Sequence, residues 1–158
     1  MLVSLEELLE VLQEERKKGK RVVFTNGCFD IIHAGHVDYL RKAKSLGDIL
    51  VVGLNSDESI RRIKGEKRPI IPQRMRAEVL SSLKPVDYVV IFEEDTPENL
   101  IKAIRPEVLV KGGDWELSKV VGKDFVESYG GKVLTIPFTY EISTTKIINT
   151  ILERYCSD

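Results

Sequence analysis

The sequence has 158 residues, of which 42% are hydrophobic and 31% are charged, with 24 basic against 25 acidic side chains. This length fits one domain with its own core, so we expect a single domain over residues 1–158. Its motif-bearing core is expected at about residues 20–152, after an N-terminal helix within residues 1–18. The formal net charge of −1 gives no basic excess that would indicate nucleic acid or an anionic membrane as a partner.

The N-terminal segment Met1–Arg16 is acidic with helical spacing, which does not fit a secretory signal. No apolar run approaches the ~18 residues that a membrane-spanning helix needs. Cys28 and Cys156 are the only cysteines, so no disulfide framework is expected. These features exclude the membrane, disulfide-rich and disordered classes and predict a reducing, cytoplasmic location.

Short runs rich in valine and isoleucine alternate along the chain with longer segments of helical spacing. The runs are typical of strands buried on both faces of a parallel sheet. In chain order, the predicted strands are Arg21–Thr25, Ile49–Asn55, Asp87–Phe92, Val108–Val110 and Lys132–Ile136. The predicted helices are Leu5–Lys17, Val37–Leu46, Gln73–Leu83, Glu98–Ile104, Lys123–Tyr129 and Thr144–Arg154, with an extra turn at Glu58–Ile63. This order predicts an α/β fold: one doubly wound, Rossmann-like, five-stranded parallel sheet with helices on both faces.

The connections that leave the carboxyl ends of these strands are rich in glycine, hydroxyl, amide and charged groups. Right-handed crossovers place all of them on one edge of the sheet, where doubly wound folds bind their ligands. The connections are residues 26–36, 55–57, 93–97, 111–115 and the approach to 143–146. We therefore expect a site for a polyanionic ligand at this edge.

Both histidines of the chain, His33 and His36, lie where the first of these connections enters a helix. Residues three apart share a helix face, and Gly35 between them lets a ligand approach the backbone. Imidazoles at a helix N-terminus are suited to stabilising charge on a transferring phosphoryl group. Two alternatives stay open: a pair without function, or a zinc site with Cys28 or Asp30, although no clean four-ligand spacing is present.

A second motif, Ser143-Thr144-Thr145-Lys146, precedes an apolar helical stripe. Lys146 stands where a capping box has Glu or Gln, and a cation in the first turn opposes the helix dipole unless an anion is bound there. We predict a second phosphate-binding helix terminus; the alternative is a plain N-cap by Ser143.

A basic stretch over Arg61–Arg68, which includes Lys64 and is followed by Arg74 and Arg76, comes after the second strand. It predicts a cationic flap that closes over phosphates, with a solvated charged face as the alternative. Further along, Lys111-Gly112-Gly113-Asp114-Trp115 combines paired glycines with the only tryptophan. The glycines allow a ligand close to the backbone, and the ring would stack on a base or, alternatively, cap the core.

These motifs resemble the nucleotidyltransferase superfamily that carries the HxGH signature. Asn26-Gly27-Cys28-Phe29-Asp30 with His33-Ala34-Gly35-His36 fits the first signature, and Ile142–Ile147 resembles the second. The closer similarity is to the adenylyltransferase domain of the bifunctional heptose kinase/adenylyltransferases of lipopolysaccharide synthesis. It extends over about residues 5–152 and includes Asn55-Ser56-Asp57 and Glu94-Asp95-Thr96-Pro97.

The resemblance implies transfer of AMP from ATP to D-glycero-β-D-manno-heptose 1-phosphate, giving ADP-heptose and pyrophosphate. It implies catalytic roles in holding the phosphates for His33, His36, Lys64 and Arg76. The implied nucleotide-binding residues are Asn26, Gly27, Cys28, Phe29, Gly35, Lys111, Gly112, Asp114, Ser143 and Thr144. We predict that Asp30, Asn55 and Asp57 bind the substrate and that the protein itself holds no metal.

Mg²⁺ is expected to arrive on the triphosphate, held mainly by phosphate oxygens and water. The expected partners are ATP and a sugar 1-phosphate, and a homodimer is plausible by analogy with the superfamily. Related cytidylyltransferases carry an arginine where this chain has Phe138-Thr139-Tyr140-Glu141, which weakens a CTP reading. The alternatives are a cytidylyltransferase acting on glycerol 3-phosphate or another phosphorylated metabolite, and a nucleotide-binding module without catalysis.

Overall fold

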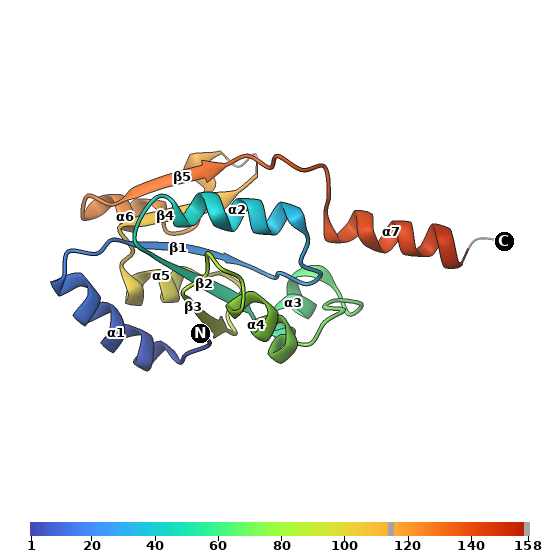
Figure 1. Cartoon of the computed structure of the whole chain (residues 1–158), viewed down its shortest axis with the longest axis horizontal. Helices are drawn as coiled ribbons and strands as arrows, with labels where there is room; N and C mark the ends of the chain where they lie inside the picture. The colour runs from blue at the N-terminus through green and yellow to red at the C-terminus, as the bar shows by residue number, and fades with distance from the viewer. Residues whose placement is uncertain (114–115, 157–158) are drawn as a thin grey trace.

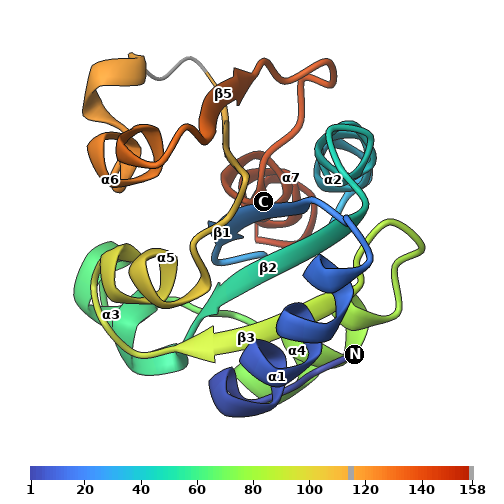
Figure 2. The same ribbon diagram turned by 90° about the vertical axis from the view of Figure 1, so that its left-hand side faces the viewer.

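The computed structural model describes residues 1–113 and 116–156. A five-stranded sheet forms its centre, with all strands parallel in the order β3-β2-β1-β4-β5 (Figures 1 and 2). The strands are β1 Val22–Gly27, β2 Ile49–Asn55, β3 Tyr88–Phe92, β4 Val108–Gly112 and β5 Lys132–Ile136. The helices are α1 Leu5–Lys17, α2 Ala34–Lys44, α3 Asp57–Lys64, α4 Gln73–Ser81, α5 Glu98–Ile104, α6 Lys123–Ser128 and α7 Thr144–Tyr155, with a 3₁₀ turn at Leu117–Lys119. The predicted fold class is confirmed.

Each face of the sheet carries its own hydrophobic core because successive strand residues point to opposite sides. Val22 and Phe24 of β1 pack with apolar residues of α1, α5 and α6, whereas Val23 between them packs with α2 and α4. All three side chains are fully buried. This two-sided burial explains the continuous apolar runs in the sequence.

The elements begin and end close to their predicted positions, with informative exceptions. The extra turn predicted after β2 is a full helix, α3, because Ser56 caps its N-terminus by accepting a hydrogen bond from the Ser59 N–H at 3.2 Å. The first helix after β1 starts at Ala34, earlier than the predicted Val37, because His33 serves as its N-cap.

The N-terminal residues extend the sheet, which the sequence analysis did not predict. Leu2 forms a parallel bridge to Val89 of the edge strand β3. The Val3 N–H donates to the Val89 carbonyl at 3.0 Å, and the Val89 N–H donates to the Met1 carbonyl at 2.9 Å. The chain then turns into α1, whose capping box of Ser4 and Glu7 fixes its first turn.

Candidate active site

A cleft of about 610 Å³ opens at the carboxyl ends of the strands. It lies next to the point between β1 and β4 where the strand order reverses direction, the usual ligand position in doubly wound sheets. Many sequence-predicted site residues line it: Asn26, Gly27, Cys28, Phe29, Asp30, His36, Asn55, Lys64, Lys111, Ser143 and Thr144. The structure therefore brings together side chains from both ends of the chain.

The remaining predicted residues lie around this cleft or outside the described structure. His33 and Gly35 are at the N-terminus of α2, and Gly112 ends β4. Asp57 and Arg76 form an ion pair with each other behind the lining. Asp114, like Trp115, lies outside the described residues.

Part of the lining is apolar and was not predicted. Ile60 and Ile63 of α3 face the cleft, as does Val121. The spacing of the two isoleucines, three residues apart, is the signal that would have placed both on one face of a helix. These side chains give the cleft an apolar wall suited to a base or a sugar face.

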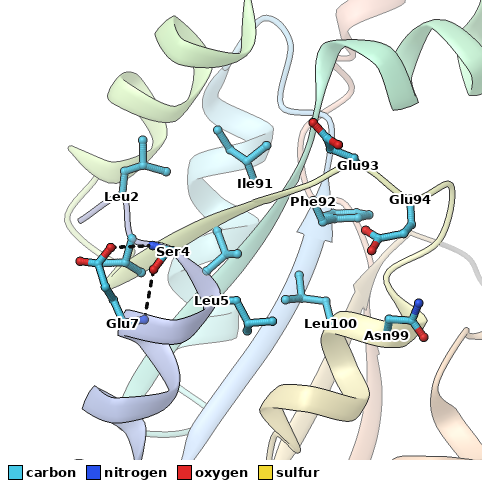
Figure 3. Close-up of a pocket in the computed structure, with 12 residues that line it drawn as sticks. Leu2, Ser4, Leu5, Glu7, Ile91, Phe92, Glu93, Glu94, Asn99 and Leu100 are labelled. Carbon is cyan, nitrogen blue, oxygen red and sulfur yellow. Dashed lines mark hydrogen bonds between the residues drawn. The ribbon is translucent and has the colours of Figure 1, made fainter.

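A second hollow, of about 700 Å³, lies beside the outer edge of β3 between α1 and α5 (Figure 3). Its lining mixes apolar side chains, such as Leu2, Ile91 and Leu100, with polar ones. Among the described residues, the charged side chains that line it are Glu7, Glu93 and Glu94. Because the charged side chains described around this hollow are all acidic, it is a poor site for a polyphosphate.

The two histidines form a stacked pair at the start of α2. Their ring centroids are 3.8 Å apart with an interplanar angle of 27°. The His33 Nδ1 accepts a hydrogen bond from the Gly35 N–H at 3.1 Å, and the His36 Nδ1 accepts one from the His33 N–H at 3.2 Å. A neutral imidazole that accepts at Nδ1 must carry its proton on Nε2. Both rings therefore have an Nε2–H donor for a ligand.

Electrostatics keeps these rings neutral. Burial, with a smaller contribution from His33, lowers the pKa of His36 to about 4, and burial also lowers the pKa of His33. The positive end of the α2 dipole acts in the same direction. At neutral pH the pair is thus uncharged and presents hydrogen-bond donors next to the free N–H groups of a helix terminus.

Close packing holds the pair in place. A Cβ added to Gly35 would meet the His33 ring at 3.0 Å and the Ile142 side chain at 3.3 Å. The buried Phe29 ring also packs near His36, and the centroids of the two rings are 5.3 Å apart. Phe29 adopts a left-handed backbone conformation with φ of 47°, which is uncommon for a bulky residue and occurs where the surrounding structure enforces it.

Cations and helix termini give the cleft a positive lining. Lys64 ends α3, Lys111 lies in β4, and Arg68 follows in the connection between α3 and α4. The N-terminus of α7 also opens on the cleft, where the Ser143 Oγ accepts a hydrogen bond from the Lys146 N–H at 3.1 Å. Arg68 donates to the Thr145 Oγ1 at 3.1 Å, which joins this connection to α7.

Burial also shifts the pKa values of two groups that line the cleft, Lys111 and Cys28. It lowers the pKa of Lys111, an effect that nearby Lys64 increases. It raises the pKa of the Cys28 thiol, although Lys64 and Arg76 oppose this rise. A thiol with a raised pKa is a weak nucleophile, so Cys28 is suited to packing and not to covalent catalysis.

Arg76 is only 1% exposed and is surrounded by acceptors. Its Nε donates to the Ile71 carbonyl at 2.8 Å, and its Nη1 donates to the Cys28 and Asn55 carbonyls at 2.8 and 2.9 Å. Its Nη2 pairs with the Asp57 carboxylate at 2.8 Å. These contacts tie the carboxyl ends of β1 and β2 to α3 and α4, whereas direct contact with phosphate stays a prediction.

Asp30, which follows β1, links its loop to the segment before α4. Its Oδ1 and Oδ2 accept hydrogen bonds from the Ile70 N–H at 3.0 and 2.8 Å, and Oδ1 also accepts from the Ile71 N–H at 2.8 Å. Asn55 is likewise buried, and its amide donates to the Ser59 hydroxyl at 3.3 Å. Within the protein these polar groups position the loops of the cleft, and their contact with substrate stays a prediction.

The sequence of residues 24–150 matches the model of one protein family, described as cytidylyltransferase-like. The chain belongs to this cytidylyltransferase-like family. The match runs from β1 to the middle of α7 and therefore includes both helix termini that open on the cleft.

Curated relatives extend the comparison. The chain is 59% identical over 152 residues to the bifunctional protein HldE of Geobacter sulfurreducens. The aligned residues make up 96% of this chain and 31% of that protein. It is 59% identical over 150 residues to HldE of Syntrophotalea carbinolica, covering 95% of this chain and 31% of that protein. The chain thus spans about a third of the length of these relatives.

A solved structure is similar to the chain in both fold and sequence. A lipopolysaccharide core biosynthesis protein from Thermoplasma volcanium superposes with a TM-score of 0.62 at 29% sequence identity. The alignment covers 78% of this chain and all of that protein.

The oxygen donors of this cytidylyltransferase-like cleft fit a magnesium ion that enters with a nucleotide. Over residues 1–113 and 116–156, no three His, Cys, Asp or Glu side chains are placed to hold a metal, so the zinc alternative finds no ligand set there. The cleft carboxylates are Asp30, held by backbone N–H groups, and Asp95, paired with Arg62 at 2.8 Å. Mg²⁺ that arrives on a triphosphate is held mainly by phosphate oxygens and water, so these two engaged carboxylates would add at most a secondary contact.

The helices are shorter than the about 20 apolar residues that a bilayer crossing needs. In the described part of this family member, none is both long and apolar enough to span a membrane.

Proposed function

We propose that this chain transfers AMP from ATP to D-glycero-β-D-manno-heptose 1-phosphate, forming ADP-heptose and pyrophosphate. The observation that carries the proposed chemistry is the stacked His33–His36 pair with both Nε2–H donors at the N-terminus of α2. Support for the substrates comes from the resemblance to heptose adenylyltransferases and from 59% identity to HldE proteins.

In the proposed reaction, an oxygen of the sugar 1-phosphate attacks the α-phosphorus of ATP in line. A new bond forms between the sugar phosphate oxygen and the α-phosphorus. The bond from the α-phosphorus to the bridging oxygen breaks, and pyrophosphate leaves with the electron pair of that bond. No covalent enzyme intermediate is needed, so catalysis consists of positioning and charge stabilisation. Bound Mg²⁺ would neutralise part of the phosphate charge.

The residues of the cleft divide these tasks. The Nε2–H groups of His33 and His36 donate to phosphate oxygens without changing their own protonation, because burial keeps both rings neutral. Lys64 and Lys111 supply positive charge to the cleft. The N-terminus of α7, with Thr144, offers N–H groups for the pyrophosphate end.

A second candidate is cytidylyl transfer to glycerol 3-phosphate or a similar metabolite. The match to the cytidylyltransferase-like family model is the observation that favours this candidate. Against it, the segment before the second signature lacks the arginine of related cytidylyltransferases. Both candidates use the same phosphate site and differ in base and acceptor.

The test is a panel that measures pyrophosphate release from ATP or CTP with heptose 1-phosphate or glycerol 3-phosphate. We expect turnover with ATP and heptose 1-phosphate to exceed the other combinations by at least tenfold in kcat/KM. Highest turnover with CTP would support the second candidate, and ATP binding without turnover on any acceptor would support a binding module.

Both cysteines are free, in line with the reducing cytoplasm that we propose as the location.

A further inference from the structure

Elements from both faces of the sheet contribute to the cleft. Helix α2, which carries His36, packs on one face, whereas α5 packs on the opposite face. The connection between β3 and α5, residues 93–97, therefore reaches the cleft from the side away from α2. Its residues Asp95, Thr96 and Pro97 line the cleft, and no step of the proposed reaction yet uses them.

The direction of the proposed reaction, on which this inference rests, indicates what that side binds. In an in-line transfer the attacking and leaving oxygens lie on opposite sides of the phosphorus. The pyrophosphate end is proposed at the N-terminus of α7, which is on the α2 side because Ile142 lies close to Gly35. The attacking sugar 1-phosphate therefore enters from the opposite side, where residues 93–97 lie.

Asp95 is an exposed carboxylate in a cleft whose other features suit phosphates. Its Oδ1 accepts a hydrogen bond from the Arg62 Nε at 2.8 Å, and Arg62 also donates to the Glu93 carbonyl. This ion pair orients the carboxylate and offsets its charge. No second hydrogen bond to Asp95 comes from residues 1–113 or 116–156, so its Oδ2 is open to a ligand. A carboxylate repels phosphate but accepts hydrogen bonds from hydroxyl groups, so it suits the sugar part of a sugar phosphate.

The polar residues that the sequence predicts as substrate ligands are already engaged within the protein. Asp30 accepts three hydrogen bonds from backbone N–H groups. Asp57 forms an ion pair with the buried arginine of α4, and the Asn55 amide donates to a hydroxyl of α3. Of the two described carboxylates that line the cleft, Asp95 therefore has the greater free capacity to accept a hydrogen bond.

We propose that Asp95 and Thr96 bind hydroxyl groups of the acceptor sugar and so select a polyhydroxylated sugar 1-phosphate. Thr96 also lines the cleft, and its hydroxyl can both donate and accept a hydrogen bond. Ile63 and Val121, which are 49% and 39% exposed, line the same cleft and offer an apolar surface to the C–H face of a sugar ring. A few polar groups beside an apolar wall are the usual means of fixing the orientation of a ligand.

The test compares Asp95→Ala with Glu94→Ala in steady-state kinetics with ATP, Mg²⁺ and D-glycero-β-D-manno-heptose 1-phosphate. Glu94 is the matched control because it is the neighbouring exposed carboxylate but lines the second hollow (Figure 3). Both side chains are on the surface, so both variants should fold. For Asp95→Ala we expect the KM for the sugar 1-phosphate to rise by about tenfold or more. Its kcat and its KM for ATP should stay within about twofold of wild type, and Glu94→Ala should keep all three values.

An unchanged KM for the sugar 1-phosphate in Asp95→Ala, or an equal rise in Glu94→Ala, would overturn the inference. A higher KM for ATP or a higher Mg²⁺ requirement, without a change for the sugar, would also overturn it, because Asp95 would then contact the ribose or the metal. A wild-type protein that does not turn over heptose 1-phosphate is a separate result. It would contradict the proposed function, and this inference with it.

Discussion

The rings of His33 and His36 stack 3.8 Å apart, and each accepts a backbone hydrogen bond at Nδ1. The backbone at the start of α2 therefore sets the tautomer of both side chains. With burial holding both rings neutral, the pair acts as two fixed donors at Nε2. Fixed donors need no reorganisation when charge develops on a phosphate, which is the condition for efficient electrostatic catalysis.

Replacing His36 by Asn separates its role as a hydrogen-bond acceptor at Nδ1 from its role as a donor at Nε2. The Asn carbonyl can take the place of Nδ1 as acceptor for the His33 N–H, but no donor remains where Nε2–H was. We expect kcat/KM to fall by about 100-fold, or ~2.7 kcal/mol, with the unfolding free energy nearly unchanged. His36→Ala, which removes both features, is the comparison. A loss below tenfold in either variant would show that the assigned role is wrong.

The lowered pKa values of the histidines predict how stability depends on pH. Since the folded pKa of His36 is about 4 and the unfolded value is near 6.5, the unfolded chain binds more protons between these values. The contribution of His36 to the unfolding free energy should therefore be constant above about pH 7 and fall as the pH drops from 6.5 toward 4. Urea unfolding across this range measures the effect. His36→Asn should have a shallower slope, and an identical slope would contradict the buried neutral ring.

Arg76 and Arg74 provide a matched pair on α4. Arg76 is buried with four acceptors, and Arg74 is exposed. Arg76→Lys leaves buried carbonyls and the Asp57 carboxylate short of donors, so we expect a loss of about 3–5 kcal/mol in unfolding free energy. Arg74→Lys should change it by less than about 0.5 kcal/mol. Equal effects in urea titrations of the two variants would count against this positioning role.

Gly35→Ala tests the close approach beside the histidines. A methyl group there favours the helix by about 0.5–1 kcal/mol but meets the His33 ring at 3.0 Å and the Ile142 side chain at 3.3 Å. We expect these effects nearly to cancel in stability while the displaced ring lowers kcat/KM by about tenfold. Parallel unfolding and steady-state kinetic measurements check this. Full activity would mean that the ring position is not critical.

The sequence predicts the sheet, and it predicts that the loops after the strands lie together at the cleft, because both follow from short-range patterns. Continuous apolar runs mark strands buried on two faces, and the three-residue spacing of His33 and His36 places them together. The surroundings of Arg76 were not predictable in this way, since its acceptors at Cys28 and Asn55 are backbone carbonyls from distant segments. The exposure of α7 was also hidden, because an apolar stripe has the same spacing whether it faces its own core or another molecule.

The most direct test of the account is a crystal structure with α,β-methylene-ATP, which binds but cannot transfer AMP. The triphosphate should lie at the N-terminus of α2, with phosphate oxygens within hydrogen-bond distance of the Nε2 atoms of His33 and His36. A triphosphate bound outside this cleft, or the two imidazoles coordinating a transition metal instead, would contradict the account.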